Sequence, residues 1–282
     1  MEKIITLDSD SMKIMDRLDR KMMQEKFKAG PKRTLITMTD HDTGEVLGTY
    51  ENKILITASI FTATNAFGIP SPITLPNYND ELGLDHTLDY GTVKQMNTPI
   101  VCLFCIGDSG CGTMPSDVYV AKYTDRIEPE NDIIPFRYVD SGADLSDDLR
   151  QYYFGRKTIE GENKIAYYFK AFDSTPQLHL RYTDGTQIND EMYNIETTQA
   201  AECYVEVKLR ITRLDFRDYF EAVSGWDKAR ISTLSLCYAW YDDTVDKYKW
   251  YQQIYPYSKL NFAAEWLVDL TKAIDFNYQV FY

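Results

Sequence analysis

A run of alternating apolar and polar residues from Cys203 to Arg213 constrains this chain more than any other feature of its sequence. The odd positions from Cys203 to Ile211 are apolar, and the even positions from Tyr204 to Thr212 are charged or carry a hydroxyl. A period of two is typical of a long β-strand with one buried face. The run therefore predicts a protein built on β-sheet.

Other segments repeat this pattern, whereas helical patterns are few. Strands are expected at residues 34–39, 45–50, 52–57, 100–106, 165–172, 177–182, 202–213, 231–241, 248–255 and 275–282. Short helices are expected at 59–67, 145–153 and 215–223, the last of them capped by Asp215. Sequential strands with few helical insertions favour a mainly β fold with minor α, an antiparallel β-sandwich-like core with long ordered loops.

Residues 9–28 form the clearest amphipathic helix. Its apolar side carries Met12, Met15, Leu18 and Met22. Methionine adapts to irregular surfaces, so these four residues are candidates for binding a partner chain, with packing on the chain's own core as the alternative. The predicted organisation is an N-terminal helical arm at 1–30 and a β-rich domain at 31–282.

Two segments are rich in turn-forming residues. Residues 75–99 show no sustained period, and we expect them to form an ordered excursion anchored by Tyr78, Leu82, Leu84 and Leu88. Residues 113–161 are acidic and contain several prolines, so the region 113–163 is the possible internal boundary. Long loops in a compact domain are usually binding elements or subunit contacts.

Composition excludes several classes of protein. The net charge of −13 and the lack of a dense basic run disfavour direct nucleic-acid recognition. No segment of 18 apolar residues is present, and the N-terminus is acidic, so neither a membrane protein nor a secreted one is expected. Five cysteines, an odd number, suggest free thiols in a reducing cytoplasm.

Three cysteines are the candidate metal ligands. Cys102, Cys105 and Cys111 lie within ten residues of one another, and His86 or Cys203 could complete a zinc site through tertiary contact. The apolar segment around the first two suits a β-strand, whose alternation would send Cys102 and Cys105 to opposite faces. Buried apolar thiols are therefore the favoured interpretation, and we expect neither a metal nor a cofactor.

The sequence lacks a convergent set of catalytic residues. His41, His86 and His179 are scattered, and the motifs GxSxG and HExxH are absent. His179 alternates with leucines and should lie on the more exposed face of a strand. The loop from Asp40 to Glu45 resembles a calcium loop only superficially, because Gly44 stands at its fifth position. We expect no enzymatic activity.

The order of these features resembles a virion structural protein of tailed bacteriophages, of the neck, collar or tail accessory type. The resemblance rests on the N-terminal helix, on the segments 42–47 and 51–56 followed by Phe61, and on a tyrosine-rich β half that ends in a strand. It spans most of the chain without a diagnostic short motif. It implies a non-enzymatic head-to-tail connector or tail component that is made in the host cytoplasm and resides in the virion.

That resemblance implies assembly as a homo-oligomeric ring, in contact with other virion proteins. From the charge and the lack of a long apolar segment, we expect no direct reading of nucleic acid and no membrane partner. One alternative is a carbohydrate- or ligand-binding β-sandwich module, for example of a baseplate or receptor-binding protein, in which exposed tyrosines and tryptophans would stack on sugar rings. A hydrolase built on paired carboxylates is a further alternative. The four tryptophans are Trp226, Trp240, Trp250 and Trp266.

Overall fold

A computed structural model describes residues 33–54, 62, 78–85, 99–113, 119–121, 133–182, 201–223, 225, 228–241, 251–266 and 273–282. The arm expected at 1–30, with Met12, Met15, Leu18 and Met22, lies outside these residues. So does all but Thr62 of the helix expected at 59–67.

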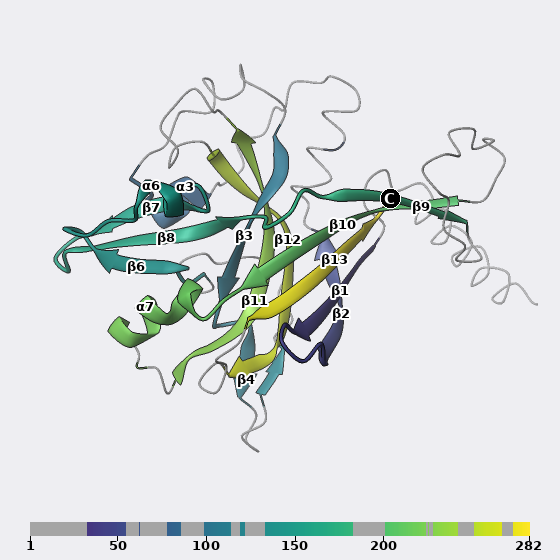
Figure 1. Ribbon diagram of the computed structural model, residues 1–282, viewed down its shortest axis with the longest axis horizontal. Coiled ribbons are helices and arrows are strands. Elements are labelled where there is room, and N and C mark those ends of the chain that lie inside the picture. The colour runs from purple at the N-terminus through teal and green to yellow at the C-terminus, as the bar shows by residue number, and fades with distance from the viewer. Residues whose placement is uncertain are drawn as a thin grey trace, which may run out of the picture.

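Eleven antiparallel strands form one continuous hydrogen-bonded ladder (Figure 1). They are β1 (Arg33–Asp40), β2 (Val46–Ile54), β3 (Ile100–Gly107), β6 (Arg137–Asp140), β7 (Tyr153–Ile159), β8 (Lys164–Ala171), β9 (Gln177–Tyr182), β10 (Ala201–Ile211), β11 (Arg230–Tyr241), β12 (Tyr251–Trp266) and β13 (Ile274–Phe281). The spatial order is β6-β8-β3-β11-β12-β2-β1-β13-β10-β9, and β7 pairs with β8. A separate pair joins β4 (Cys111–Thr113) to β5 (Tyr119–Ala121). The described helices are α3 (Tyr78–Leu82), α6 (Asp147–Arg150) and α7 (Leu214–Val223).

Strand β2 carries the ladder from one layer into the other. Its residues 46–52 pair with β1, whereas Lys53 and Ile54 pair with β12. We call the layer β9-β10-β13-β1-β2 sheet A, and the layer of β12, β11, β3, β8, β6 and β7 sheet B. The predicted fold class, mainly β with an antiparallel sandwich-like core, is confirmed.

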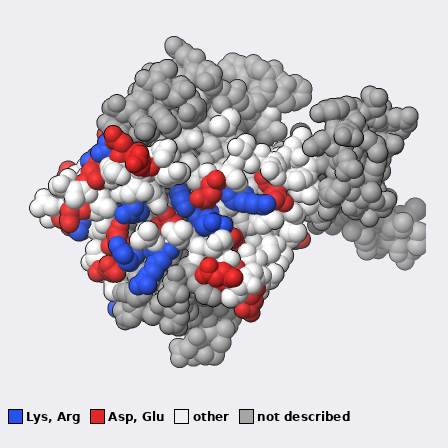
Figure 2. All heavy atoms as spheres, in the orientation of Figure 1, with Lys and Arg blue, Asp and Glu red and all other residues white. Residues whose placement is uncertain are grey.

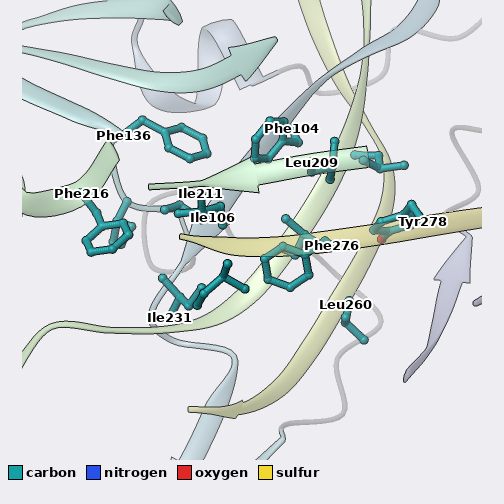
Figure 3. Packing of buried hydrophobic residues seen from close by; sticks show 14 of the residues in the cluster. Phe104, Ile106, Phe136, Leu209, Ile211, Phe216, Ile231, Leu260, Phe276 and Tyr278 are labelled. Carbon is teal, nitrogen blue, oxygen red and sulfur yellow. The ribbon is translucent and has the colours of Figure 1, made fainter. Parts of the chain in front are cut away.

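The core lies between the two sheets (Figure 3). Alternate residues of β13 are buried, from Ile274 to Val280, while Asp275, Asn277 and Gln279 between them are partly exposed. The long alternating run behaves the same way in β10, where Val207, Leu209 and Ile211 enter the core. The buried faces of sheet A thus meet Phe104 of β3 and Leu260 of β12 from sheet B.

Sheet B is covered on its other face as well, by the segment that contains α3. Tyr78, Leu82 and Leu84 pack there against Phe169, which confirms these three expected anchors. The side chain of Asn79 also accepts a hydrogen bond from the backbone N–H of Ile254, at 2.7 Å. That N–H lies beside an irregularity of β12, and Asn79 thereby satisfies a donor buried away from water.

The region 113–161 was expected to be a loop with a helix at 145–153, and this prediction is wrong in part. It contains β6 and β7, and its helix α6 is only four residues long. Strand β7 begins with Tyr153 and Phe154 but continues with Gly155. Its sequence therefore lacks the alternation of apolar and polar residues that would predict a strand. The flanking strands β3 and β8 pair directly with each other.

Helix α7 closes one end of the core. Phe216 and Phe220 are buried in it, and Arg137 of β6 pairs with Asp218 at 2.9 Å. Asp215 was expected to precede this helix as its cap. It lies instead within the first turn, where its carboxylate reaches back to the backbone N–H of Thr212 at 2.5 Å.

Candidate functional site

A pocket of about 490 Å³ opens on the outer face of sheet A. Its lining residues come from three strands and the loop after β8, and they are Thr39, Asp173, Ser174, Lys208, Leu209, Arg210, Asp275, Phe276 and Asn277. The strands place them there because polar residues of β10 and β13 alternate with the core residues and point outward. The carboxamide oxygen of Asn277 is buried and has no hydrogen-bond partner among the described residues.

Asp275 is the centre of the charged groups at this pocket. Its carboxylate accepts a hydrogen bond from Nε of Arg210 at 2.8 Å, and its other oxygen lies 2.8 Å from Nδ1 of His41. Burial alone would raise the pKa of Asp275. The hydrogen bonds from Arg210 and His41 outweigh that effect, so its pKa lies below the usual value for aspartate.

A second set of charged side chains extends from Asp173 at the pocket to Asp215 in the core. Asp173 accepts the backbone N–H of Arg210 at 2.7 Å and lies 3.4 Å from the ammonium group of Lys170. Lys170 is buried and lies 3.3 Å from Asp215, which is fully buried and also accepts the hydroxyl of Tyr153 at 2.5 Å. Each buried charge thus has an opposite charge and further hydrogen bonds, as burial requires.

These contacts define what the pocket can do chemically. Its carboxylates are paired with Lys170 and Arg210, His41 contacts one of them, and the pocket offers hydrogen bonds to a polar ligand. Among the described residues, no hydroxyl or thiol is hydrogen-bonded to His41.

The candidate metal ligands are buried in two places. Cys102 and Cys105 belong to the cluster on the outer face of sheet B, where the sulfurs of Cys105 and Cys237 lie 3.9 Å apart. Cys111 is buried in β4, outside that cluster. All four are free thiols, and no group of three or more metal-binding side chains occurs in the part of the chain that the structure describes.

The expectation that Cys102 and Cys105 lie on opposite faces is wrong. Their strand pairs with β11, and the register shifts there: Leu103 is opposite Cys237, whereas Val101 is opposite Tyr238. Cys102 is therefore the extra residue of a β-bulge, which breaks the alternation and lets it join Cys105. Burial raises the pKa of the Cys102 thiol above its range for an exposed cysteine, which disfavours the thiolate form.

Strands β7 and β9 both lie at an edge of the ladder, and they differ in how their open sides are covered. The edge of β7 is closed by Asp85, whose N–H donates to the carbonyl of Arg156 and whose carboxylate accepts the N–H of Thr158 at 2.7 Å. The opposite edge, β9, has no backbone partner beyond β10 among the described residues. In Figure 1 the ribbon of β9 and β10 runs past the C-terminal end of β13, away from sheet B.

The exposed side of β9 is not the one that the sequence indicated. Leu178 is 64% exposed, whereas His179 is half-buried and stacks on Tyr204 with ring centres 4.9 Å apart. The prediction for His179 is therefore wrong. Tyr204 in turn contacts Phe281, so an aromatic row covers this end of the polar face of sheet A.

Sequence reasoning missed the pocket residues. Lys208, Arg210 and Asp275 were present in the alternating strands, but the pattern only marks them as outward-facing. Their convergence depends on β10 and β13 being neighbours, which pairs Lys208 with Asn277 and Arg210 with Asp275. That pairing joins strands more than sixty residues apart.

Comparisons with known proteins give no relative from which function could be transferred. No family model, no curated protein and no solved structure matches the chain. Within the described residues, no helix has the length and apolar character needed to span a membrane.

Proposed function

We propose that this chain is a non-enzymatic structural subunit of a bacteriophage particle, at the head-to-tail neck, collar or tail, where it forms a ring with identical copies and contacts other virion proteins. The observation that carries the proposal is the β9–β10 ribbon. It extends beyond the sandwich and ends in a strand whose open side no described residue covers.

An open edge is a template for pairing with another chain, and monomeric proteins usually block it. This chain blocks the edge of β7 with Asp85 and leaves a large apolar side chain, Leu178, exposed on β9. The contrast within one molecule favours β9 as a contact between subunits. The N-terminal residues Met12, Met15, Leu18 and Met22 remain proposed partner contacts by their sequence pattern.

Assembly of the purified full chain tests this proposal. Sedimentation velocity and negative-stain electron microscopy should show concentration-dependent oligomers that include rings. Leu178→Lys should shift the distribution toward smaller species, because a charge at an edge opposes pairing. Val46→Lys is the matched control, since Val46 is exposed to a similar degree, 58%, in β2. A monomer at all concentrations would count against the proposal, and equal behaviour of both variants would exclude the β9 contact.

The pocket on sheet A favours one second candidate, a carbohydrate- or ligand-binding module. Asn277 presents a buried acceptor that a ligand hydroxyl would satisfy. Two observations weigh against sugar binding: the pocket lining includes only one aromatic residue, the buried Phe276, and Trp240 is buried in the core. Binding of the wild-type protein on a glycan array, lost in Asn277→Leu, would favour this candidate.

A further inference from the structure

The face turned toward the viewer in Figure 2 carries basic side chains across its middle, over β10 and α7. We name Lys208, Arg210 and Arg217 the basic strip. Each lies within 4.0 Å of a carboxylate, so its charge is partly compensated. The sign of the charge that the surface presents to another molecule depends on which member of each ion pair is more exposed.

In the basic strip, the base is the more exposed member of the shortest ion pair that each residue forms. Lys208 is 66% exposed and its partner Glu206 14%. Arg210 is 46% exposed and Asp275 33%. Arg217 is 40% exposed and Asp218 16%, although its second, more distant partner Glu221 is 54% exposed. The strip therefore presents positive charge on a chain whose net charge is −13.

At the end of the molecule formed by β6, α6 and β8, the relation is reversed. Asp140 is 72% exposed and its partner Lys164 27%. Asp147 is 86% exposed and Arg150 27%. Asp148 is exposed beside them in α6. We name Asp140, Asp147 and Asp148 the acidic tip. In Figure 2, acidic side chains gather over α6, on the same face as the basic strip.

We propose that this face docks on a second copy of the chain, with the basic strip of each copy against the acidic tip of the other. When two copies are related by a two-fold axis, the strip of each copy can lie against the tip of the other, so the contact forms twice. Two-fold symmetry is that of most homodimers. Charge complementarity of this kind speeds encounter and fixes register. The inference rests on the proposed function in that it takes the chain to assemble with itself.

Charge reversal tests this contact in the full chain. The strip variant carries Lys208→Glu and Arg217→Glu, and the tip variant carries Asp147→Lys and Asp148→Lys. Each alone should raise the dimer dissociation constant at least about tenfold, because like charges then face each other in both contacts. An equimolar mixture of the two variants should associate as tightly as the wild type, since both contacts between unlike copies are then attractive.

Two controls separate this effect from a change in net charge. Asp42→Lys with Glu45→Lys changes the net charge as the tip variant does, in an exposed turn, and should leave association unimpaired. Raising the salt concentration from about 0.05 to 0.5 M should weaken the wild-type dimer, because screening lengths shorten accordingly.

The outcomes distinguish this inference from the proposed function. A wild-type protein that stays monomeric would overturn both. Wild-type assembly that is unaffected by either variant, or not restored by mixing, would overturn only the docking of strip on tip. If the wild type bound a labelled oligonucleotide and the strip variant did not, the basic strip would be a phosphate-binding surface. That result would also overturn the docking of strip on tip.

Discussion

Gly155 holds a backbone conformation that other residues adopt only at a cost. Its φ is 65°, and a Cβ atom placed on it would meet the ring of Phe169. The left-handed region is unfavourable for residues with a side chain by about 1–2 kcal/mol. Added volume in a packed site costs about 1–3 kcal/mol more. Glycine here allows the strand β7 to lie close against β8.

Gly155→Ala should therefore lower the free energy of unfolding by about 2–5 kcal/mol, measured by urea denaturation followed by circular dichroism. Gly44→Ala is the matched control. Gly44 has a similar φ of 71°, but no atom lies within 4 Å of its added Cβ, so only the backbone term of about 1–2 kcal/mol applies. Equal losses in the two variants would show that the ring of Phe169 yields freely.

Asp275 links stability to acid pH. Its pKa is lowered in the folded state, so its interactions stabilise the protein above the pKa of about 3.9 in the unfolded chain. That contribution is lost as the pH falls through the lowered folded value. Asp275→Asn should be less stable than the wild type at neutral pH, and the difference should shrink below pH about 4. Asp42→Asn, in the exposed turn, is the control, and an unchanged difference at low pH would contradict the assignment.

At the scale of elements, the buried pair of Lys170 and Asp215 ties three of them together. Lys170 lies in β8, Asp215 in α7, and Tyr153 of β7 donates its hydroxyl to the same carboxylate. Removing one partner leaves an uncompensated buried charge, which costs about 3–5 kcal/mol. The pair therefore fixes where α7 and the β7–β8 hairpin lie, whatever its net contribution to stability.

A double-mutant cycle measures this coupling. Lys170→Met and Asp215→Asn should each destabilise the protein by about 3–5 kcal/mol, and the double variant by less than their sum. Lys164→Met is the control, because Lys164 pairs with the exposed Asp140, and such surface pairs contribute about 0–1 kcal/mol. Strict additivity in the cycle would mean that the two charges act independently.

The same elements show what the sequence could and could not predict. Long alternating strands such as β10 and β13 were predictable, because half their residues face a core and half face water. Strand β12 was predicted to end at Tyr255 and continues to Trp266, past Pro256, a residue usually confined to edges and irregularities. The pairing of β11 with β12 shifts in register between Leu236 and Cys237, and this irregularity accommodates the proline. Nothing in the sequence near Pro256 predicts the shift.

At the scale of the whole molecule, some features depend on which strands are neighbours, and local sequence patterns do not predict them. The bulge at Cys102 requires a partner strand, and the pocket requires β10 beside β13. The tyrosines illustrate the same point. The sequence does not show which of them are buried, and the structure places Tyr167, Tyr257 and Tyr278 within its core.

Buried tyrosines make the fold sensitive to alkaline pH. Burial raises the pKa of Tyr168 and that of Tyr238 to about 12. The pKa values of Tyr153 and Tyr257 are also raised, and burial is the largest cause. An unfolded tyrosine ionises near pH 10. These groups thus stabilise the fold fully below pH about 10, and the contribution is lost as the pH rises toward the folded values.

Absorbance at 295 nm during alkaline titration should therefore show two classes of tyrosine. A solvent-accessible phenol ionises near pH 10, whereas the buried class, which includes Tyr168 and Tyr238, should ionise only together with loss of the β-sheet signal in circular dichroism. Tyr238→Phe should reduce the amplitude of the second phase while leaving the first unchanged. A single phase near pH 10, with the sheet signal retained, would mean that the phenols are accessible to solvent and that the two layers are not closed over them.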